Sequence, residues 1–219
     1  MSQAVEDYLK AIYRLEQREG RVTTKAIAVA LDVAAPSVTA MIKRLHAMRL
    51  VRYTRYRGVG LTAGGRQVAL EVIRHHRLLE LYLVEALGLP WDQVHAEADR
   101  LEHVISEELE ERIAEHLGHP VADPHGDPIP SKGGQVEEPP GLPLSELGPG
   151  TAAVIKRVAD QDPAKLRYLA SLGLFPEVRV TLVEKAPFGG PMSLRVGDTR
   201  CILGGELARH IYVLPVEVC

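Results

Sequence analysis

A segment rich in proline and glycine, residues 119–149, constrains the fold of this chain more than any other feature. Proline lacks a backbone N–H and interrupts helices and central strands, so the segment is predicted to be a linker. Apolar residues recur at helical intervals before it, whereas short β-type runs separated by Gly or Pro follow it. We therefore predict a mainly α-helical protein with a small β part.

The composition limits the class of protein further. The 219 residues contain no run of eighteen apolar residues, and the N-terminal stretch MSQAVEDYLK lacks the apolar core of a signal peptide. The two cysteines, Cys201 and Cys219, make no disulfide framework and suit a reducing compartment. These features predict a cytoplasmic protein with no membrane partner.

Charge is distributed unevenly along the chain. Residues 1–75 hold 13 Lys and Arg against 6 Asp and Glu, a balance of +7, and residues 76–150 hold 4 against 16, a balance of −12. Residues 151–219 hold 9 against 7, which completes the net charge of −3. A basic head followed by an acidic middle predicts different partners for the two parts.

The basic head has the layout of a winged helix-turn-helix. Helices are predicted over residues 5–17, 23–33 and 36–48, and VRYTRYRGVGLT at 51–62 alternates as a hairpin does. A DNA-reading helix presents small polar residues to base edges, with Lys and Arg beside it for phosphates. A protein-interaction module of the same shape is the alternative, and the local charge favours DNA. The candidate DNA-contacting residues are Lys25, Pro36, Ser37, Thr39, Ala40, Lys43, Arg52, Arg55 and Arg57.

Further elements are predicted on both sides of the linker. One long helix reaches from a capping Thr62 to about Leu87, and another opens at Pro90, breaks, and restarts after a capping Ser106. After the linker, a helix at 164–174 precedes four short β runs, VRVTLVEK, MSLRVG, TRCILG and HIYVLP. These runs predict a small β-barrel.

The acidic middle carries potential metal ligands at helical spacing. At 100° per residue, four side chains share about a third of one helix circumference, namely His95, Asp99, Glu102 and His103. His76 and Glu80 lie four residues apart on the long helix. If the two helices pack, one ion could bind His76, Glu80 and His95, and a second could bind Asp99, Glu102 and His103.

Each of these residues also has a plainer interpretation. A single glutamate is most often part of a solvated helix face, and the pair His76 and Glu80 taken alone favours that interpretation. Isolated histidines, His125 among them, are more often surface or capped residues than metal ligands. The mixture of imidazole and carboxylate at 99–103 favours a metal, and nitrogen and oxygen donors without a thiol suit Mn²⁺ or Fe²⁺. Zn²⁺, Co²⁺, Ni²⁺ or Cd²⁺ would also bind such a set in vitro.

Several stretches together resemble one known family: VEDYLKAIYRLE, the turn at Ala35–Val38, LTAGG after Gly58, HRLLELYL, VHAEADRLEHVIS, HGDPIP and FPEVRVTLVEKAPFGGP. Over nearly its whole length the chain resembles the metal-dependent repressors of the diphtheria toxin repressor and manganese transport regulator family. The resemblance implies a winged helix-turn-helix at 1–73, metal-binding and dimerisation helices at 74–118, a linker at 119–149, and an SH3-like (FeoA-like) barrel at 150–219.

The resemblance also implies two metal sites. By position, one would use Asp7, Asp99, Glu102 and His103. The other would use His76, Glu80 and His95, with a further ligand from the barrel at Asp160 or Asp162.

Two departures from the family pattern bear on the metal. Aspartate stands at positions 7 and 99, where the iron-sensing branch has methionine and cysteine, and this moves the expectation toward Mn²⁺. Lys10 stands where the manganese branch has a glutamate that supports a paired-metal site. Its charge would occupy part of that space.

The implied function is that of a repressor, a homodimer that binds a palindromic operator when loaded with Mn²⁺ or Fe²⁺ and controls metal-uptake genes. Catalysis is not expected, because no HExxH motif, nucleophile elbow or Gly-rich phosphate loop accompanies the ligands. Two alternatives remain: a metallohydrolase, and a metal-independent winged-helix regulator with a small organic effector.

Overall fold

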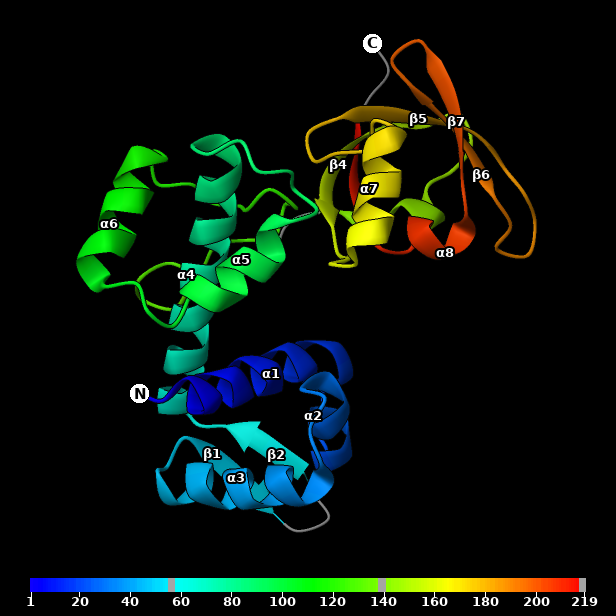
Figure 1. The fold of residues 1–219 in the computed structure, drawn as a ribbon. Helices are drawn as coiled ribbons and strands as arrows, with labels where there is room; N and C mark the ends of the chain where they lie inside the picture. The colour runs from blue at the N-terminus through cyan, green and yellow to red at the C-terminus, as the bar shows by residue number, and fades with distance from the viewer. Residues whose placement is uncertain (55–57, 138–140, 217–219) are drawn as a thin grey trace. The chain divides into compact units, whose positions relative to one another are not determined.

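The computed structural model describes residues 1–54, 58–137 and 141–216, and it divides into two compact units (Figure 1). The first unit comprises Met1–His76, Arg100–Glu110 and Pro130–Val136. The second comprises Arg77–Asp99, Glu111–Ile129 and Glu137–Cys219.

The N-terminal part of the first unit is a winged helix-turn-helix, as predicted. It consists of α1 (Gln3–Glu19), α2 (Thr24–Ala30), α3 (Ala35–Ala47), β1 (Val51–Thr54) and β2 (Gly58–Leu61). The caps explain the boundaries: the Thr23 hydroxyl accepts from the Ala26 amide at 3.0 Å, and Gly20 ends α1 with a φ of 67°. The apolar sides of the helices meet in one core around Leu9, Ile27 and Leu45.

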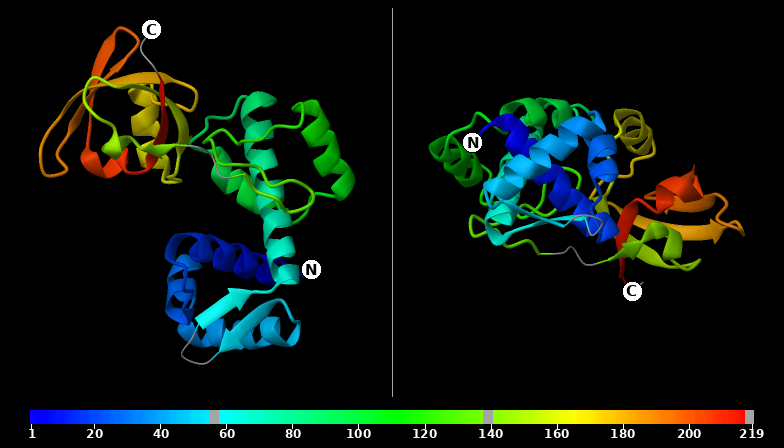
Figure 2. Two further views of the ribbon diagram at one scale, coloured as in Figure 1. Left: turned by 180° about the vertical axis from the view of Figure 1, so that it is seen from behind. Right: turned by 90° about the horizontal axis from the view of Figure 1, so that it is seen from below.

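The wing is an antiparallel hairpin tied to the first helix. Val51 pairs with Leu61, and Figure 2 shows the two strands from behind. A carboxylate oxygen of Glu16 accepts from the Leu61 amide at 2.8 Å, and the other accepts from Arg66 at 2.7 Å. The position of α1 and the position of the wing are therefore coupled.

The acidic middle contains α4 (Ala63–Glu85), α5 (Val94–Leu101) and α6 (Glu107–His116). Thr62 and Ser106 cap α4 and α6 as predicted, through bonds from Gly65 at 3.1 Å and Leu109 at 3.2 Å. Helix α5 is shorter than predicted, because it begins at Val94 rather than Pro90 and ends at Leu101. Glu102 and His103 consequently lie in the turn after α5, not on the helix.

In the part of the chain that the structure describes, no single helix is both long and apolar enough to cross a bilayer. Helices α2 and α3 reach that length and composition only as a pair, and they are bent by 111° where they join.

The segment predicted as a linker packs more closely than its composition suggests. In the second unit the His125 carbonyl accepts from the Val158 amide at 2.8 Å, and Arg77 of α4 donates to the Pro128 carbonyl. Gly126, with a φ of 83°, passes so close to β4 that an added Cβ would lie 2.0 Å from the Lys156 carbonyl oxygen. The described residues of this segment form no long helix or strand. Side chains and strands that are distant in sequence therefore provide hydrogen-bond partners for its backbone groups.

The C-terminal part of the second unit is the predicted small β structure. Its antiparallel strands are ordered β3-β8-β4-β5-β6-β7. The elements are β3 (Leu142–Pro143), a 3₁₀ turn (Leu144–Glu146), β4 (Ala152–Val158), α7 (Pro163–Ser171), β5 (Arg179–Lys185), β6 (Met192–Val196), β7 (Thr199–Leu203), α8 (Gly205–Ala208) and β8 (Ile211–Val216). The sequence did not predict β4, which pairs with both β5 and β8 and contributes the buried Ile155. Its apolar residues run together in AAVI instead of alternating, so the period-2 pattern is weak.

Gly65 at the start of α4 offers a stability test. An added Cβ at Gly65 would lie 1.9 Å from the Leu50 carbonyl oxygen, whereas at Gly64 it would lie 4.0 Å from the Thr62 hydroxyl oxygen. We expect Gly65→Ala to lower the free energy of unfolding by about 1–3 kcal/mol, because the backbone must move. Gly64→Ala, the matched control, should be neutral or stabilising by up to about 1 kcal/mol. Thermal unfolding followed by circular dichroism measures both, and equal melting temperatures would contradict the close approach.

Candidate metal centre and nucleic-acid interface

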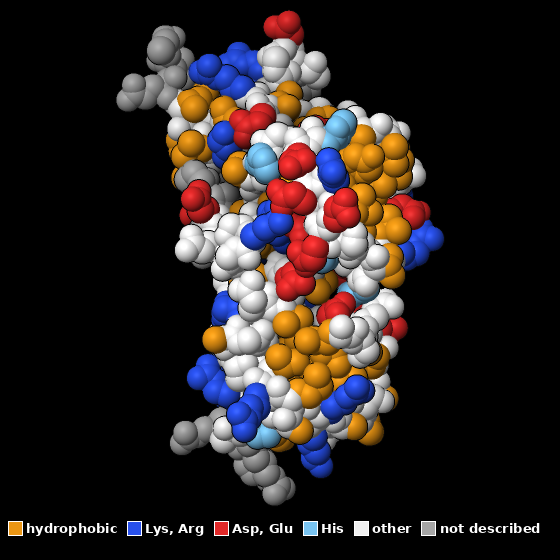
Figure 3. Space-filling view, turned by 90° about the vertical axis from the view of Figure 1, so that its left-hand side faces the viewer, with side chains coloured by type: hydrophobic (Ala, Val, Ile, Leu, Met, Phe, Trp, Pro, Cys, Tyr) orange, Lys and Arg blue, Asp and Glu red, His pale blue; other side chains and the backbone are white. Residues whose placement is uncertain are grey.

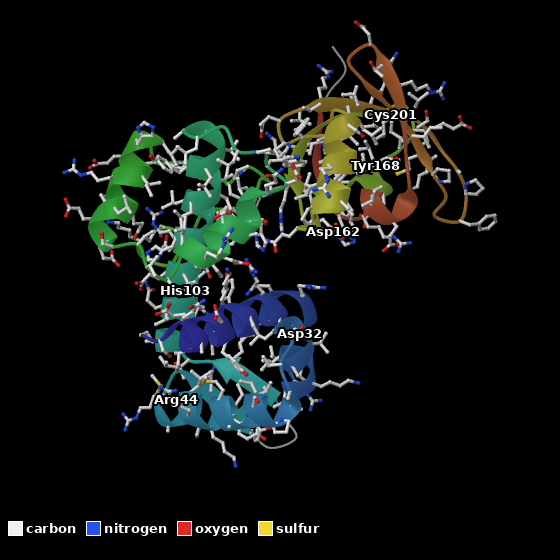
Figure 4. All side chains as sticks on the ribbon, in the orientation of Figure 1. Asp32, Arg44, His103, Asp162, Tyr168 and Cys201 are labelled. Atoms are coloured by element: carbon white, nitrogen blue, oxygen red, sulfur yellow. The ribbon has the colours of Figure 1, made fainter. Side chains whose placement is uncertain are left out.

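Three predicted ligands converge within the first unit. Asp7, Glu102 and His103 each offer one ligand atom, and these atoms all lie within 4.8 Å of one another. His103 Nε2 is 2.9 Å from Asp7 Oδ1 and 3.2 Å from Glu102 Oε1. Asp7 comes from α1, and His103 reaches it from the turn after α5 (Figure 4). The cluster therefore joins the DNA-binding head to a segment nearly a hundred residues later.

The donor atoms suit a divalent cation. His103 Nε2 is buried and makes no hydrogen bond of acceptable geometry, although two carboxylate oxygens lie close to it. The other ring nitrogen, Nδ1, lies 2.6 Å from Glu6 Oε2, so a proton on Nδ1 would be donated to Glu6. This leaves the Nε2 lone pair directed at the carboxylates, which is the tautomer that a metal requires.

Burial and neighbouring charges act differently on the two carboxylates. Burial raises the pKa of Asp7, and the nearby charge of Glu102 adds to this, while His103 opposes it. Burial also opposes ionisation of Glu102, but hydrogen bonds from His76 and Lys10 outweigh it and hold the pKa of Glu102 below its usual value. Glu102 thus keeps a negative charge in the protein interior.

Lys10 contributes a positive charge to the same cluster. Its ammonium nitrogen donates to both carboxylate oxygens of Glu102, at 2.8 Å and 2.6 Å, and lies 3.2 Å from His76 Nδ1. His76 Nδ1 is in turn 2.5 Å from Glu102 Oε2. The Lys10 ammonium therefore lies directly beside one of the predicted ligands, Glu102.

Four further predicted ligands belong to α4 and α5, namely His76, Glu80, His95 and Asp99. In the second unit, Glu80 Oε1 is 2.9 Å from His95 Nδ1, so these two predicted partners do meet. Asp99 is exposed on α5, and its carboxylate lies 3.5 Å from His95 Nε2. His76 occupies the turn of α4 that precedes Glu80.

The sequence analysis did not identify a fully buried cluster of potential ligands in the second unit. Glu80, Asp123 and His125 of the second unit are all buried, with potential ligand atoms within 4.8 Å of one another. Of the two interpretations of His125 as a surface or a capped residue, burial excludes the first, since its side chain is 2 % exposed and stacks on Trp91. Its Nε2 carries the proton and donates it to the Trp91 carbonyl oxygen at 2.9 Å. The unprotonated Nδ1 therefore has a lone pair that could bind a cation. The Asp-Pro-His spacing inside the proline-rich segment was the available indication.

Burial raises the pKa of Asp123 well above its usual value, and the charges of Asp127 and Glu80 raise it further. Arg77 opposes this effect only in part. A cation between Glu80 and Asp123 would relieve the same repulsion.

The two barrel aspartates have structural roles of their own. Asp162 caps α7 by accepting from the Ala164 amide at 2.8 Å, at the start of the helix in Figure 4. Asp160 accepts from the Lys165 ammonium at 2.7 Å. In the described part of the chain, neither belongs to a cluster of three potential ligands.

The predicted DNA-facing side of α3 is open to solvent. Val38, Ile42 and Leu45 are buried on one side of this helix. Lys and Arg side chains stand out around the head in the space-filling view (Figure 3), and Arg44 projects from α3 in Figure 4. Arg55 and Arg57 lie outside the described residues. The exposed candidates are Lys25, Pro36, Ser37, Thr39, Ala40, Lys43 and Arg52.

A winged helix-turn-helix whose first helix supplies a potential metal ligand is typical of one class of protein, the DNA-binding regulators with a metal centre.

Comparison with known protein families agrees with this class in three segments of the chain. Residues 1–59 match the family model of the iron dependent repressor, N-terminal DNA binding domain. Residues 62–131 match that of the iron dependent repressor, metal binding and dimerisation domain, and residues 142–215 match the FeoA domain.

Individual relatives match along most of their length. The iron-dependent repressor IdeR of Mycobacterium tuberculosis is 38% identical over 227 residues, which cover 96% of each chain. A solved manganese-dependent transcriptional repressor in complex with manganese is 38% identical, with a TM-score of 0.88 over 97% of this chain and 100% of that one. The structure of ScaR with bound Zn²⁺ is 34% identical, with a TM-score of 0.80 over 97% and 99%.

The chain therefore belongs to the family of iron- and manganese-dependent repressors that includes the diphtheria toxin repressor. It is a metal-dependent transcriptional repressor with an N-terminal DNA-binding domain, a helical dimerisation domain and a C-terminal SH3-like FeoA domain. Its relatives are transcriptional repressors rather than enzymes.

Glu6 provides a test of the metal cluster, because it was not predicted from sequence and orients His103. We expect Glu6→Ala to weaken Mn²⁺ binding by about 10–100-fold, as the loss of a bond to a ligating histidine does elsewhere. Isothermal titration of chelator-stripped protein measures the change. Glu16→Ala, on the same helix but bonded to Leu61 and Arg66, is the control and should bind Mn²⁺ normally. If the two variants bind Mn²⁺ with equal affinity, Glu6 does not contribute to the metal site.

Proposed function

We propose that the chain is a cytoplasmic, homodimeric repressor that binds a palindromic operator when loaded with Mn²⁺, with Fe²⁺ as the alternative signal, and that it controls metal-uptake genes. The observation that carries the proposal is the convergence of Asp7, on the first helix of the DNA-binding head, with Glu102 and His103. Half-sites of a palindrome match the two-fold symmetry of a dimer.

Two ligand groups are proposed. Asp7, Glu102 and His103 would hold one ion. We add Asp99 to this group because it precedes Glu102 by three residues and His103 by four. Glu80 and His95 would hold a second ion, and we add His76 because it lies one helical turn before Glu80 on α4. Asp123 and His125 offer Glu80 an alternative set of partners in the second unit.

Manganese is proposed because the donors are carboxylate oxygens and imidazole nitrogens, with no thiol or thioether among them. The similarity to a manganese-dependent repressor solved with manganese supports this choice. The similarity to the iron-dependent IdeR keeps Fe²⁺ as the alternative. ScaR has been solved with Zn²⁺ and with Cd²⁺, so these ions, like Co²⁺, are expected to bind in vitro.

The proposed mechanism places α1 under control of the cluster. Without an ion, the ionised Glu102 faces Asp7, and like charges disfavour their approach. A bound divalent ion would add positive charge between these two carboxylates, beyond the charge that Lys10 already places beside Glu102. Asp7 would then hold α1 in one position, and α1 contacts both α2 and the wing strand β2. The recognition helices of the dimer would adopt a defined spacing through a shift in the population of domain arrangements.

The metal dependence is testable by fluorescence anisotropy of labelled genomic DNA fragments with chelator-stripped protein at fixed salt. We expect DNA binding to appear only on titration with Mn²⁺ or anaerobic Fe²⁺, and Asp99→Ala and His103→Ala to abolish this stimulation. His119→Ala, at an exposed position outside these ligand groups, should behave as wild type. DNA binding that is unaffected by both metal and chelator would instead favour the metal-independent regulator.

The DNA interface is testable through its salt dependence. If Lys43 contacts a phosphate, Lys43→Ala should weaken DNA binding and reduce the slope of log affinity against log salt by about one. Lys156→Ala, which removes a lysine paired with Glu177 in the barrel, should leave the slope unchanged. A wild-type slope in Lys43→Ala would place the interface elsewhere.

A further inference from the structure

Lys10 is an unusual lysine, because it is only 5 % exposed. Lysine is almost never buried to this extent unless its charge is paired. Its partner is Glu102, whose two oxygens it contacts at 2.8 Å and 2.6 Å. Lys10 follows Asp7 by three residues on α1, so both side chains project from one side of the helix toward the same carboxylate.

The Lys10 ammonium group donates to Glu102 Oε1, the same oxygen that a metal ion in the cluster would bind. Glu102 Oε1 lies 3.2 Å from His103 Nε2, on the side where Asp7 completes the donor set, and 2.8 Å from Lys10 Nζ. A protonated lysine has three donors and no lone pair, so it cannot act as a ligand itself. It withdraws electron density from Glu102, and it repels a dication a few ångströms away in an environment that screens charge poorly.

His103 and Glu102 each have a partner in addition to Lys10 or apart from it. Glu6 fixes His103 through its Nδ1 at 2.6 Å, and His76 Nδ1 lies 2.5 Å from Glu102 Oε2. Removal of the ammonium therefore leaves the ligand side chains with partners that orient them. A purely structural ion pair predicts the opposite outcome, in which loss of Lys10 loosens Glu102 and weakens metal binding.

We infer that Lys10 is an internal cation that competes with the metal for Glu102 and sets the metal concentration at which the Asp7–Glu102–His103 cluster fills. Its charge takes the place of a second ion, so the cluster holds one. The inference rests on the proposed metal function of this cluster and adds a residue that tunes its affinity without ligating the metal.

The test compares neutral and charged residues at position 10 in the full-length, chelator-stripped protein. Lys10→Met keeps the length and apolar stem of the side chain but removes the charge, and Lys10→Arg keeps the charge. Mn²⁺ affinity is measured by competition with a fluorescent chelator. We expect Lys10→Met to bind Mn²⁺ at least about tenfold more tightly than wild type, and Lys10→Arg to bind no more tightly than wild type.

A matched control separates a local effect from a change in net charge. Arg66 is also paired with a glutamate of α1 in the first unit, but that residue is Glu16, outside the cluster. Arg66→Met should leave the affinity unchanged. Lys10→Gln provides a second neutral variant should Lys10→Met fold poorly, and the thermal shift produced by saturating Mn²⁺ gives a readout independent of DNA. Both neutral variants should show a larger shift than wild type.

The outcomes distinguish this inference from the proposed function. Equal or weaker Mn²⁺ binding by folded Lys10→Met or Lys10→Gln overturns the competition and makes Lys10 a structural residue. If His103→Ala leaves the Mn²⁺ affinity of the wild-type background unchanged, the cluster is not the metal site and the proposed function of these ligands fails instead.

Discussion

The buried carboxylate of Glu102 is the constraint on which the centre of the first unit depends. A charged group with 2 % exposure is costly unless surrounding charges and hydrogen bonds compensate it. Lys10 from α1 and His76 from α4 provide the compensation, and His103 lies on the opposite oxygen. One side chain thereby brings together the DNA-binding head, the long helix and the turn after α5.

The backbone of that turn is fixed as firmly as the side chain. His75 Nδ1 lies 3.1 Å from the Glu102 carbonyl oxygen, and its Nε2 lies 3.2 Å from Glu110 Oε2. Arg74 donates to the other oxygen of Glu110 at 2.5 Å. Adjacent residues of α4 thus serve different purposes: His76 contacts the Glu102 carboxylate, while His75 holds the backbone that carries it. The turn that carries Glu102 and His103 is thus held through both its backbone and its side chains.

In the second unit, charged side chains also stabilise a buried polar segment, although this segment is rich in proline and glycine. Between Ala122 and Ile129, the Asp127 carboxylate forms ion pairs with Arg77 of α4 and Arg157 of β4. The Asp123 carboxylate accepts from the His125 and Asp127 amides at 2.8 Å and 2.9 Å, so charged side chains supply partners to part of this buried segment. The result places Asp123 and His125 next to Glu80, so a proline-rich segment contributes to a possible cation site.

The sequence by itself determined the elements whose causes are local. Periodicity and caps at Thr62 and Ser106 predicted the helices, Gly58 and the alternating residues predicted the wing, and the charge imbalance predicted the DNA-facing head. Helical spacing also selected Glu102 and His103 as ligands, although α5 ends before them. Only the tertiary structure decided that Glu6 orients His103, that Lys10 shares Glu102, and that His125 is buried beside Glu80. These contacts join residues that are tens of positions apart, and their geometry follows from how separate elements pack, which no pattern of neighbouring residues contains.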